Sequence, residues 1–204
     1  MSNPSPFPDR QPWPMRWVAL IIVVTLGGYT ALTLLTRKPG RAHEPYHELK
    51  ERANTGRLLA AGYQRVELEI HRTAETGAIA NHTLPAPGGL PEPLRATLID
   101  APMLPADVLA VSAAPVADAD QPYSVLFRCA VRDDAQQLAA VVLYVQGDGI
   151  VIVPHFERLS GGLQSRSREA NATATVPGGS LKPGRYRVSL LGSQTSRAWT
   201  LDVR

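Results

Sequence analysis

The sequence is poor in cysteine and in lysine, and each shortage excludes a class of protein. Cys129 is the only cysteine among 204 residues, so no internal disulfide can form and a disulfide scaffold is excluded. Arginine supplies most of the positive charge, the net charge is only +3, and the part expected to fold has no dense basic cluster. Because nucleic-acid-binding domains concentrate positive charge on one face, we expect no nucleic-acid partner.

The sequence also lacks the short motifs that accompany common chemistry. It contains no G-x-S-x-G nucleophile elbow, no Walker loop, no G-x-G-x-x-G fingerprint and no C-x-x-C pair. Its carboxylates are scattered through expected loops and lack the spacing of an EF-hand calcium loop. We therefore predict a non-catalytic protein with no cofactor and no small-molecule substrate.

Two pairs of residues are nevertheless candidates for metal binding. His43 and His47 have the spacing that can place two ligands on one helix face, but Pro45 between them favours a helix that begins after His43. His155 ends an apolar strand that could lie beside the strand of Cys129, but a zinc or copper site needs at least a third protein ligand. An anchored metal-handling or enzymatic domain is therefore kept as an alternative, and no metal site is assigned.

What the sequence does contain is a long uncharged run, WVALIIVVTLGGYTALTLLT, at residues 17–36. At ~1.5 Å per residue, a helix of this length spans the ~30 Å hydrocarbon core of a bilayer. The membrane interface would then be contacted by aromatic residues before the run and basic residues after it, namely Trp13, Trp17, Arg37, Lys38 and Arg41. We predict a transmembrane helix whose first partner is the lipid bilayer.

The run is longer than the apolar region of a signal peptide, and no small-x-small cleavage site follows it. We therefore predict an uncleaved signal anchor in a single-pass membrane protein. Two arginines precede the run and five basic residues follow closely, a balance that favours a cytoplasmic C-terminal domain. The layout of the chain, with a short tail, one early anchor and a large C-terminal domain, favours an extracytoplasmic C-terminal domain. We predict this orientation. A cytoplasmic regulatory domain is the alternative.

One face of the predicted membrane helix carries small residues. Gly27 and Ala31 are four positions apart, and Gly28 lies beside them. Small residues at this spacing let two helices approach closely in lipid. These three residues are a candidate helix–helix contact, and they indicate a partner that is itself a membrane protein or a subunit of a membrane complex.

The chain divides by composition into four segments. Residues 1–16 are rich in proline and should form a disordered tail, and residues 17–36 form the membrane helix. Residues 37–62 read as a basic juxtamembrane segment followed by a helix. Residues 63–204 contain short apolar runs separated by proline and glycine, which is typical of a β domain.

Strands are expected wherever apolar and polar residues alternate or an apolar run is short. Alternation predicts strands near residues 64–71, 184–192 and 197–204. Residues 123–131, 138–146 and 150–156 are apolar on both faces and should be central strands, and Gly147-Asp148-Gly149 indicates a tight hairpin between the last two. We also expect strands at 94–99, at 108–111 and within the ATATV stretch.

About eight short strands with frequent turns predict an antiparallel immunoglobulin-like β-sandwich. The stretch from Leu181 to Leu190, L-x-P-G-x-Y-x-V-x-L, is similar to strand entries in many immunoglobulin-like extracytoplasmic domains. Arg185 and Arg187 point outward on this strand and are a candidate partner surface. The sequence therefore predicts an anchored β domain that mediates protein–protein interaction as an accessory or assembly subunit.

Overall fold

A computed structural model describes residues 14–36, 47–72, 83–159, 161, 165 and 167–204. The chain falls into two compact units, Met1–Pro45 and Tyr46–Arg204. Among the described residues of the first unit there is one helix, α1 (Met15–Thr36), which includes the uncharged run. The segment Met15–Thr33 is long and apolar enough to cross a membrane, and a signal sequence near the N-terminus would have the same properties.

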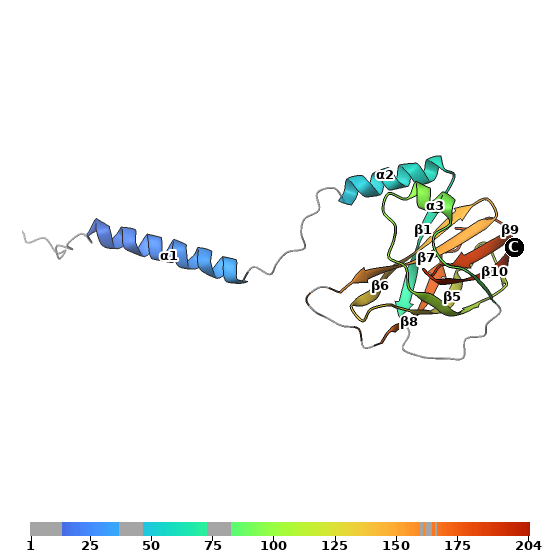
Figure 1. Ribbon diagram of the computed structural model, residues 1–204. Coiled ribbons are helices and arrows are strands. Elements are labelled where there is room, and N and C mark those ends of the chain that lie inside the picture. The colour runs from blue at the N-terminus through green and yellow to red at the C-terminus, as the bar shows by residue number, and fades with distance from the viewer. Residues whose placement is uncertain (1–13, 37–46, 73–82, 160, 162–164, 166) are drawn as a thin grey trace, which may run out of the picture. The chain divides into compact units, whose positions relative to one another are not determined.

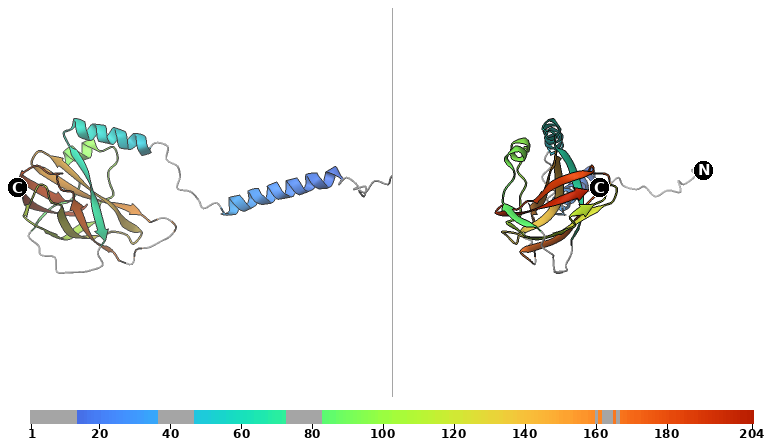
Figure 2. Two further views of the ribbon diagram at one scale, coloured as in Figure 1. Left: turned by 180° about the vertical axis from the view of Figure 1, so that it is seen from behind. Right: turned by 90° about the vertical axis from the view of Figure 1, so that its right-hand side faces the viewer.

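The second unit is a closed β-barrel, so the predicted immunoglobulin-like β-sandwich is wrong. Eight strands form the ring in the order β10-β3-β5-β8-β1-β6-β7-β9, and β9 pairs with β10 to complete it. Two short strands, β2 and β4, pair with β10 outside the ring. Figures 1 and 2 show the strands curving around one axis. In a sandwich the outer strands of each sheet stay unpaired, whereas here parallel pairing of β7 with β9 helps to join the strands into one ring.

The ring strands lie where alternation or a short apolar run in the sequence predicts a strand, with bounds that differ by one to three residues at most ends. The ring strands are β1 (Gln64–Arg72), β3 (Asp107–Ala113), β5 (Tyr123–Ala130), β6 (Gln136–Gln146), β7 (Gly149–Arg158), β8 (Glu169–Val176), β9 (Gly184–Leu190) and β10 (Thr195–Val203). The additional strands are β2 (Leu84–Pro87) and β4 (Val116–Ala117). The predicted hairpin is confirmed, because Gln146 pairs with Gly149 around a two-residue turn. Gly147 has φ of 58° there, a conformation that favours glycine.

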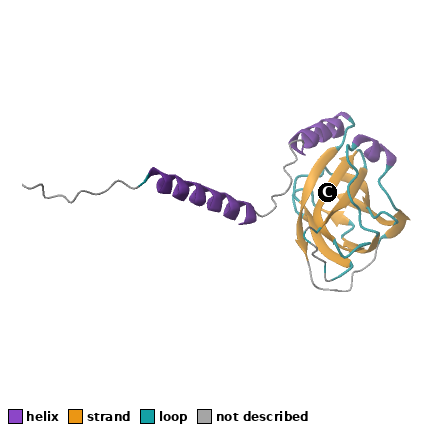
Figure 3. Cartoon of the chain, turned by 60° about the vertical axis from the view of Figure 1, so that its left-hand side comes forward, coloured by secondary structure: helices purple, strands orange, loops and turns teal. Residues whose placement is uncertain are grey.

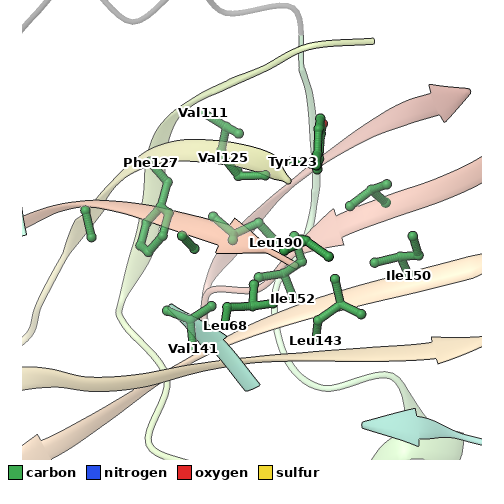
Figure 4. Close-up of a cluster of buried hydrophobic side chains, with 14 of the residues drawn as sticks. Leu68, Val111, Tyr123, Val125, Phe127, Val141, Leu143, Ile150, Ile152 and Leu190 are labelled. Atoms are coloured by element: carbon green, nitrogen blue, oxygen red, sulfur yellow. The ribbon is translucent and has the colours of Figure 1, made fainter. Parts of the chain in front are cut away.

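The barrel interior is filled by apolar side chains from every ring strand. Figure 4 shows part of this cluster, in which side chains from strands far apart in the sequence converge. The labelled members are Leu68, Val111, Tyr123, Val125, Phe127, Val141, Leu143, Ile150, Ile152 and Leu190. At roughly 25 cal/mol per Å² of buried apolar surface, this interior is the main stabilising element of the domain.

A second apolar cluster lies outside the ring and explains why two strands are apolar on both faces. The outer faces of β6 and β7 are covered by α2 (His47–Ala60) and α3 (Glu92–Thr97), which lie together on one side of the barrel (Figures 1 and 3). The buried members of this cluster are Leu58, Tyr63, Leu94, Leu98, Val142, Tyr144, Val153 and Leu191. The strand predicted at residues 94–99 is therefore wrong. Proline in the first turn and Glu92 favour a short helix instead, and Leu94 is its buried residue.

The ring is weakest where β10 meets β3. Only Thr195 and Asp107 pair there, and β3 carries a bulge between Val108 and Ala110. The guanidinium of Arg197 spans the gap, donating from Nε to the Val108 carbonyl at 3.3 Å and from a terminal nitrogen to the Leu109 carbonyl at 3.0 Å. A side chain thus supplies donors where a regular ladder would use backbone N–H groups.

Replacing Arg197 with methionine should destabilise the barrel more than replacing an exposed arginine. Hydrogen bonds from a charged donor are worth about 1.5–3 kcal/mol, so we expect Arg197→Met to cost about 2–3 kcal/mol. The matched control is Arg185→Met, which removes a 3.7 Å ion pair with Asp202 from the exposed face of β9 and should cost less than about 1 kcal/mol. Urea unfolding of the detergent-solubilised protein, followed by near-ultraviolet circular dichroism, measures both. Equal losses would contradict the bridging role.

Candidate functional site

The two ends of the barrel differ, and the first is sealed by aromatic residues. Tyr123 and Tyr186 are buried at this end, and their hydroxyl groups donate to the carbonyls of Ala114 and Lys182, each at 2.9 Å. The indole of Trp199 donates to the Tyr123 hydroxyl at 3.2 Å. These bonds satisfy the polar tips of large rings, so the rings can close the end without leaving buried groups unpaired.

The opposite end of the barrel opens into a cavity of about 510 Å³. Its apolar lining comes from Val131, Leu138 and Phe156, which belong to the interior cluster. The remaining described residues around it are Arg72, Gln136, Gln137, Ser165, Ser167, Glu169, Ala170 and Asn171. A volume within the range of small-ligand sites, at the mouth of a barrel, makes this the best candidate site in the described part of the chain.

Of the two charged residues described at the cavity, Glu169 forms an ion pair and Arg72 does not. Glu169 forms an ion pair with Arg128 on the adjacent strand β5 at 3.7 Å. Arg72, the last residue of β1, donates one hydrogen bond to the Leu138 carbonyl at 2.5 Å, and it takes part in none of the ion pairs found among the described residues. The cavity therefore presents one guanidinium with unused donors beside an apolar floor.

The structure does not bring Cys129 and His155 together. Cys129 lies on β5 inside the barrel, where burial raises the pKa of its thiol. His155 lies on β7, and in the sheet β8, β1 and β6 separate the two strands. No group of three or more histidine, cysteine, aspartate or glutamate residues in the described ranges is arranged to hold a metal ion. His43 lies outside those ranges, and His47 is the first residue of α2.

The two arginines of the candidate partner surface each face an acid of the same domain. Arg187 donates to Asp148 at 2.9 Å, and Arg185 lies 3.7 Å from Asp202. Both arginines are exposed, so water screens these ion pairs strongly. The structure places the two arginines on the outer face of β9, as the alternation predicts, but much of their charge is balanced locally.

The candidate helix contact and membrane-interface residues belong to the first unit. Gly27 and Gly28 are uncovered, because a Cβ at either position would meet no neighbouring atom within 4 Å. Ala31 and Trp17 are exposed on the same helix. The predictions for Trp13, Arg37, Lys38 and Arg41 fall outside the described residues.

Sequence reasoning missed the cavity. Its residues come from four ring strands and from two loops, and Arg72 reads simply as the end of an alternating strand. The only available signal was the polar cluster of Gln136 and Gln137 just before an apolar strand. Comparison of the chain with protein-family models, with curated proteins and with solved structures finds no match.

Acid should destabilise the domain through His155. Burial and, less strongly, the positive charge of Arg65 lower the pKa of His155 from 6.5 to about 4, and its Nε2 is buried without a partner. Because the unfolded chain binds the proton more tightly, the stabilisation is present above about pH 6.5 and is lost as pH falls toward about 4. Between about pH 7 and about pH 4.5 the loss from this residue should be about 2–3 kcal/mol.

The control for this effect is His155→Leu, which leaves an uncharged side chain at the same position. We expect urea unfolding of the variant to depend less on pH over that interval, with the difference from the parent growing as the pH falls. An identical pH dependence in both proteins would contradict the assignment to His155.

The thiol of Cys129 should be unreactive in the folded protein. It is fully buried, and its raised pKa keeps it protonated at neutral pH. Iodoacetamide should alkylate it only after unfolding, as intact-mass measurement with and without urea would reveal. Rapid alkylation of the native protein would show that the barrel interior opens at β5.

Proposed function

We propose that the chain is a single-pass membrane-anchored, non-catalytic protein whose β-barrel domain mediates interaction with another membrane protein. The observation that carries the proposal is α1, whose large apolar side chains are exposed all around the helix. They include Trp17, Leu20, Ile21, Ile22, Val23, Val24 and Leu26. A helix that is apolar on every side is unfavourable in water and is accommodated by a bilayer. On this proposal α1 is an uncleaved signal anchor.

The shape of the barrel favours binding of a partner through surface side chains or through the cavity, and not through an added strand. Ring closure leaves no long strand edge among the described strands, and the end strand β2 contains Pro85 and Pro87 among its four residues. Proline cannot donate a backbone hydrogen bond, so a partner is not expected to add a strand at β2. Recognition by side chains, of the kind used by an accessory or assembly subunit, is the mode that the fold favours.

The alternatives from the sequence have less support from the geometry. For an anchored metal-handling or enzymatic domain, Cys129 and His155 would need to approach each other, and the ring keeps their strands apart. Elemental analysis of the purified protein tests this alternative directly. Stoichiometric zinc, copper or iron would favour it.

Chemical crosslinking in native membranes, followed by purification in mild detergent, tests the main proposal. We expect a stable neighbouring membrane protein in the purified material. We also expect Gly27→Leu to reduce its recovery, because a bulky side chain on the small face of α1 blocks close helix approach. Tyr29→Leu, on the opposite face of the helix, is the control. Recovery of monomer alone from the parent protein would contradict the proposal.

The side of the membrane is tested by reporters fused to the C-terminus. We propose that the barrel is extracytoplasmic. Alkaline phosphatase fused to the C-terminus should then be active. Green fluorescent protein fused at the same position should not fluoresce, because it does not fold when it is exported as an unfolded chain. The opposite pattern would place the barrel in the cytoplasm and favour a regulatory domain. The two reporters control for each other because each is active on only one side.

A further inference from the structure

In the described part of the chain, the cavity at the open end of the barrel combines an apolar floor with one cation, Arg72, that forms no ion pair. Val131, Leu138 and Phe156 supply the floor, and all three side chains are buried in the interior cluster. An apolar group placed on this floor would lose contact with water at a favourable free energy of roughly 25 cal/mol per Å². The occupant should therefore have an apolar body.

The guanidinium of Arg72 determines which polar group a ligand of this cavity should carry. Leu68 and Ile70 of β1 pack in the interior cluster, and Arg72, two residues further along at the exposed end of the strand, lines the cavity. A guanidinium has five N–H donors in a planar fork, and the bond to the Leu138 carbonyl uses one of them. The fork matches a carboxylate, which can accept two parallel hydrogen bonds.

The charge balance favours a monoanion. Glu169 is the acidic residue among the described residues that line the cavity, and Arg128 compensates its charge. Among the described residues that line the cavity, this leaves one positive charge, on Arg72, which one carboxylate neutralises. A doubly charged phosphate would bring an excess negative charge beside the Glu169–Arg128 pair.

We propose that this cavity binds an apolar monocarboxylate, with the carboxylate on Arg72 and the apolar body against Val131, Leu138 and Phe156. Two sources share this chemistry: a free aliphatic or aromatic acid, and the C-terminal residue of a polypeptide with an apolar side chain. The site goes beyond the proposed partner binding and does not depend on which membrane protein co-purifies.

The test is calorimetric titration of the full chain in detergent with matched acids and amides. The free-acid probes are hexanoate and 3-phenylpropanoate, each compared with its neutral amide. The peptide probe is a glycine–serine hexapeptide ending in leucine, compared with the same peptide carrying a C-terminal amide. We expect one acid per chain and at least about tenfold weaker binding of each amide, the loss typical of one charge-assisted hydrogen-bonded pair.

Three variants locate the site. Arg72→Gln should weaken acid binding at least about tenfold, and Arg72→Lys should weaken it less because it keeps the charge and loses the fork. Gln136→Trp should also weaken binding, because a larger side chain at this lining position takes up volume in the cavity. The control is Arg158→Gln, an exposed arginine at the same end that does not line the cavity, and it should bind within about twofold of the parent. The urea midpoint of each variant shows whether it is folded.

The outcomes separate the possibilities. A hexapeptide that binds more tightly than the free acids identifies the C-terminal residue of a polypeptide as the occupant, and the reverse order identifies a small acid. Binding of amides as tight as that of the acids, or unchanged binding by folded Arg72→Gln, overturns the proposal. So does the absence of binding by every acid up to about 10 mM. A recovered membrane partner with no acid binding would leave the proposed function standing and reject this site.

Discussion

The barrel depends on β10, because this strand pairs with more strands than any other in the described part of the chain. It pairs with β9 over seven residues and with β2, β3 and β4 over shorter stretches. Where backbone pairing with β3 is reduced to one residue pair, Arg197 continues the connection through its side chain. Closing the ring in this way removes the unpaired edges that a sandwich of the same strands would expose.

Closure of the ring also determines where α2 and α3 pack. A barrel of eight strands has an interior just wide enough to be filled by side chains, so the apolar outer faces of β6 and β7 need a separate cover. Leu58 of α2 and Leu94 of α3 provide it, together with Arg57, which donates to the Ala96 carbonyl at 2.9 Å and ties the two helices to each other. The domain is thus a barrel with two helices covering one side, an end closed by aromatic residues and an end that opens into the cavity.

Local features of this fold could be predicted from the sequence, and its closure could not. Alternation correctly predicted β9 and β10, and Gly147-Asp148 correctly predicted the β6–β7 hairpin, since these depend on neighbours in the chain. The sandwich was wrong because alternation says which face of a strand is buried, not which edges pair. The contact between Arg197 and the β3 bulge joins residues 88 positions apart, and the cavity gathers residues from four ring strands and two loops. Neither the Arg197 contact nor the cavity produces a pattern among residues that are close together in the sequence.

The position of β10 in the sequence has a consequence for biogenesis. Residues 195–203 must be available before the ring can close, so the preceding 130 or so residues of the domain cannot reach their final arrangement while β10 is still inside the ribosome. Until then β3 and β9 each lack one of their two neighbouring strands in the ring. The topology thus makes closure of the ring a late step in folding, because it waits for a strand that follows the other seven ring strands in the sequence.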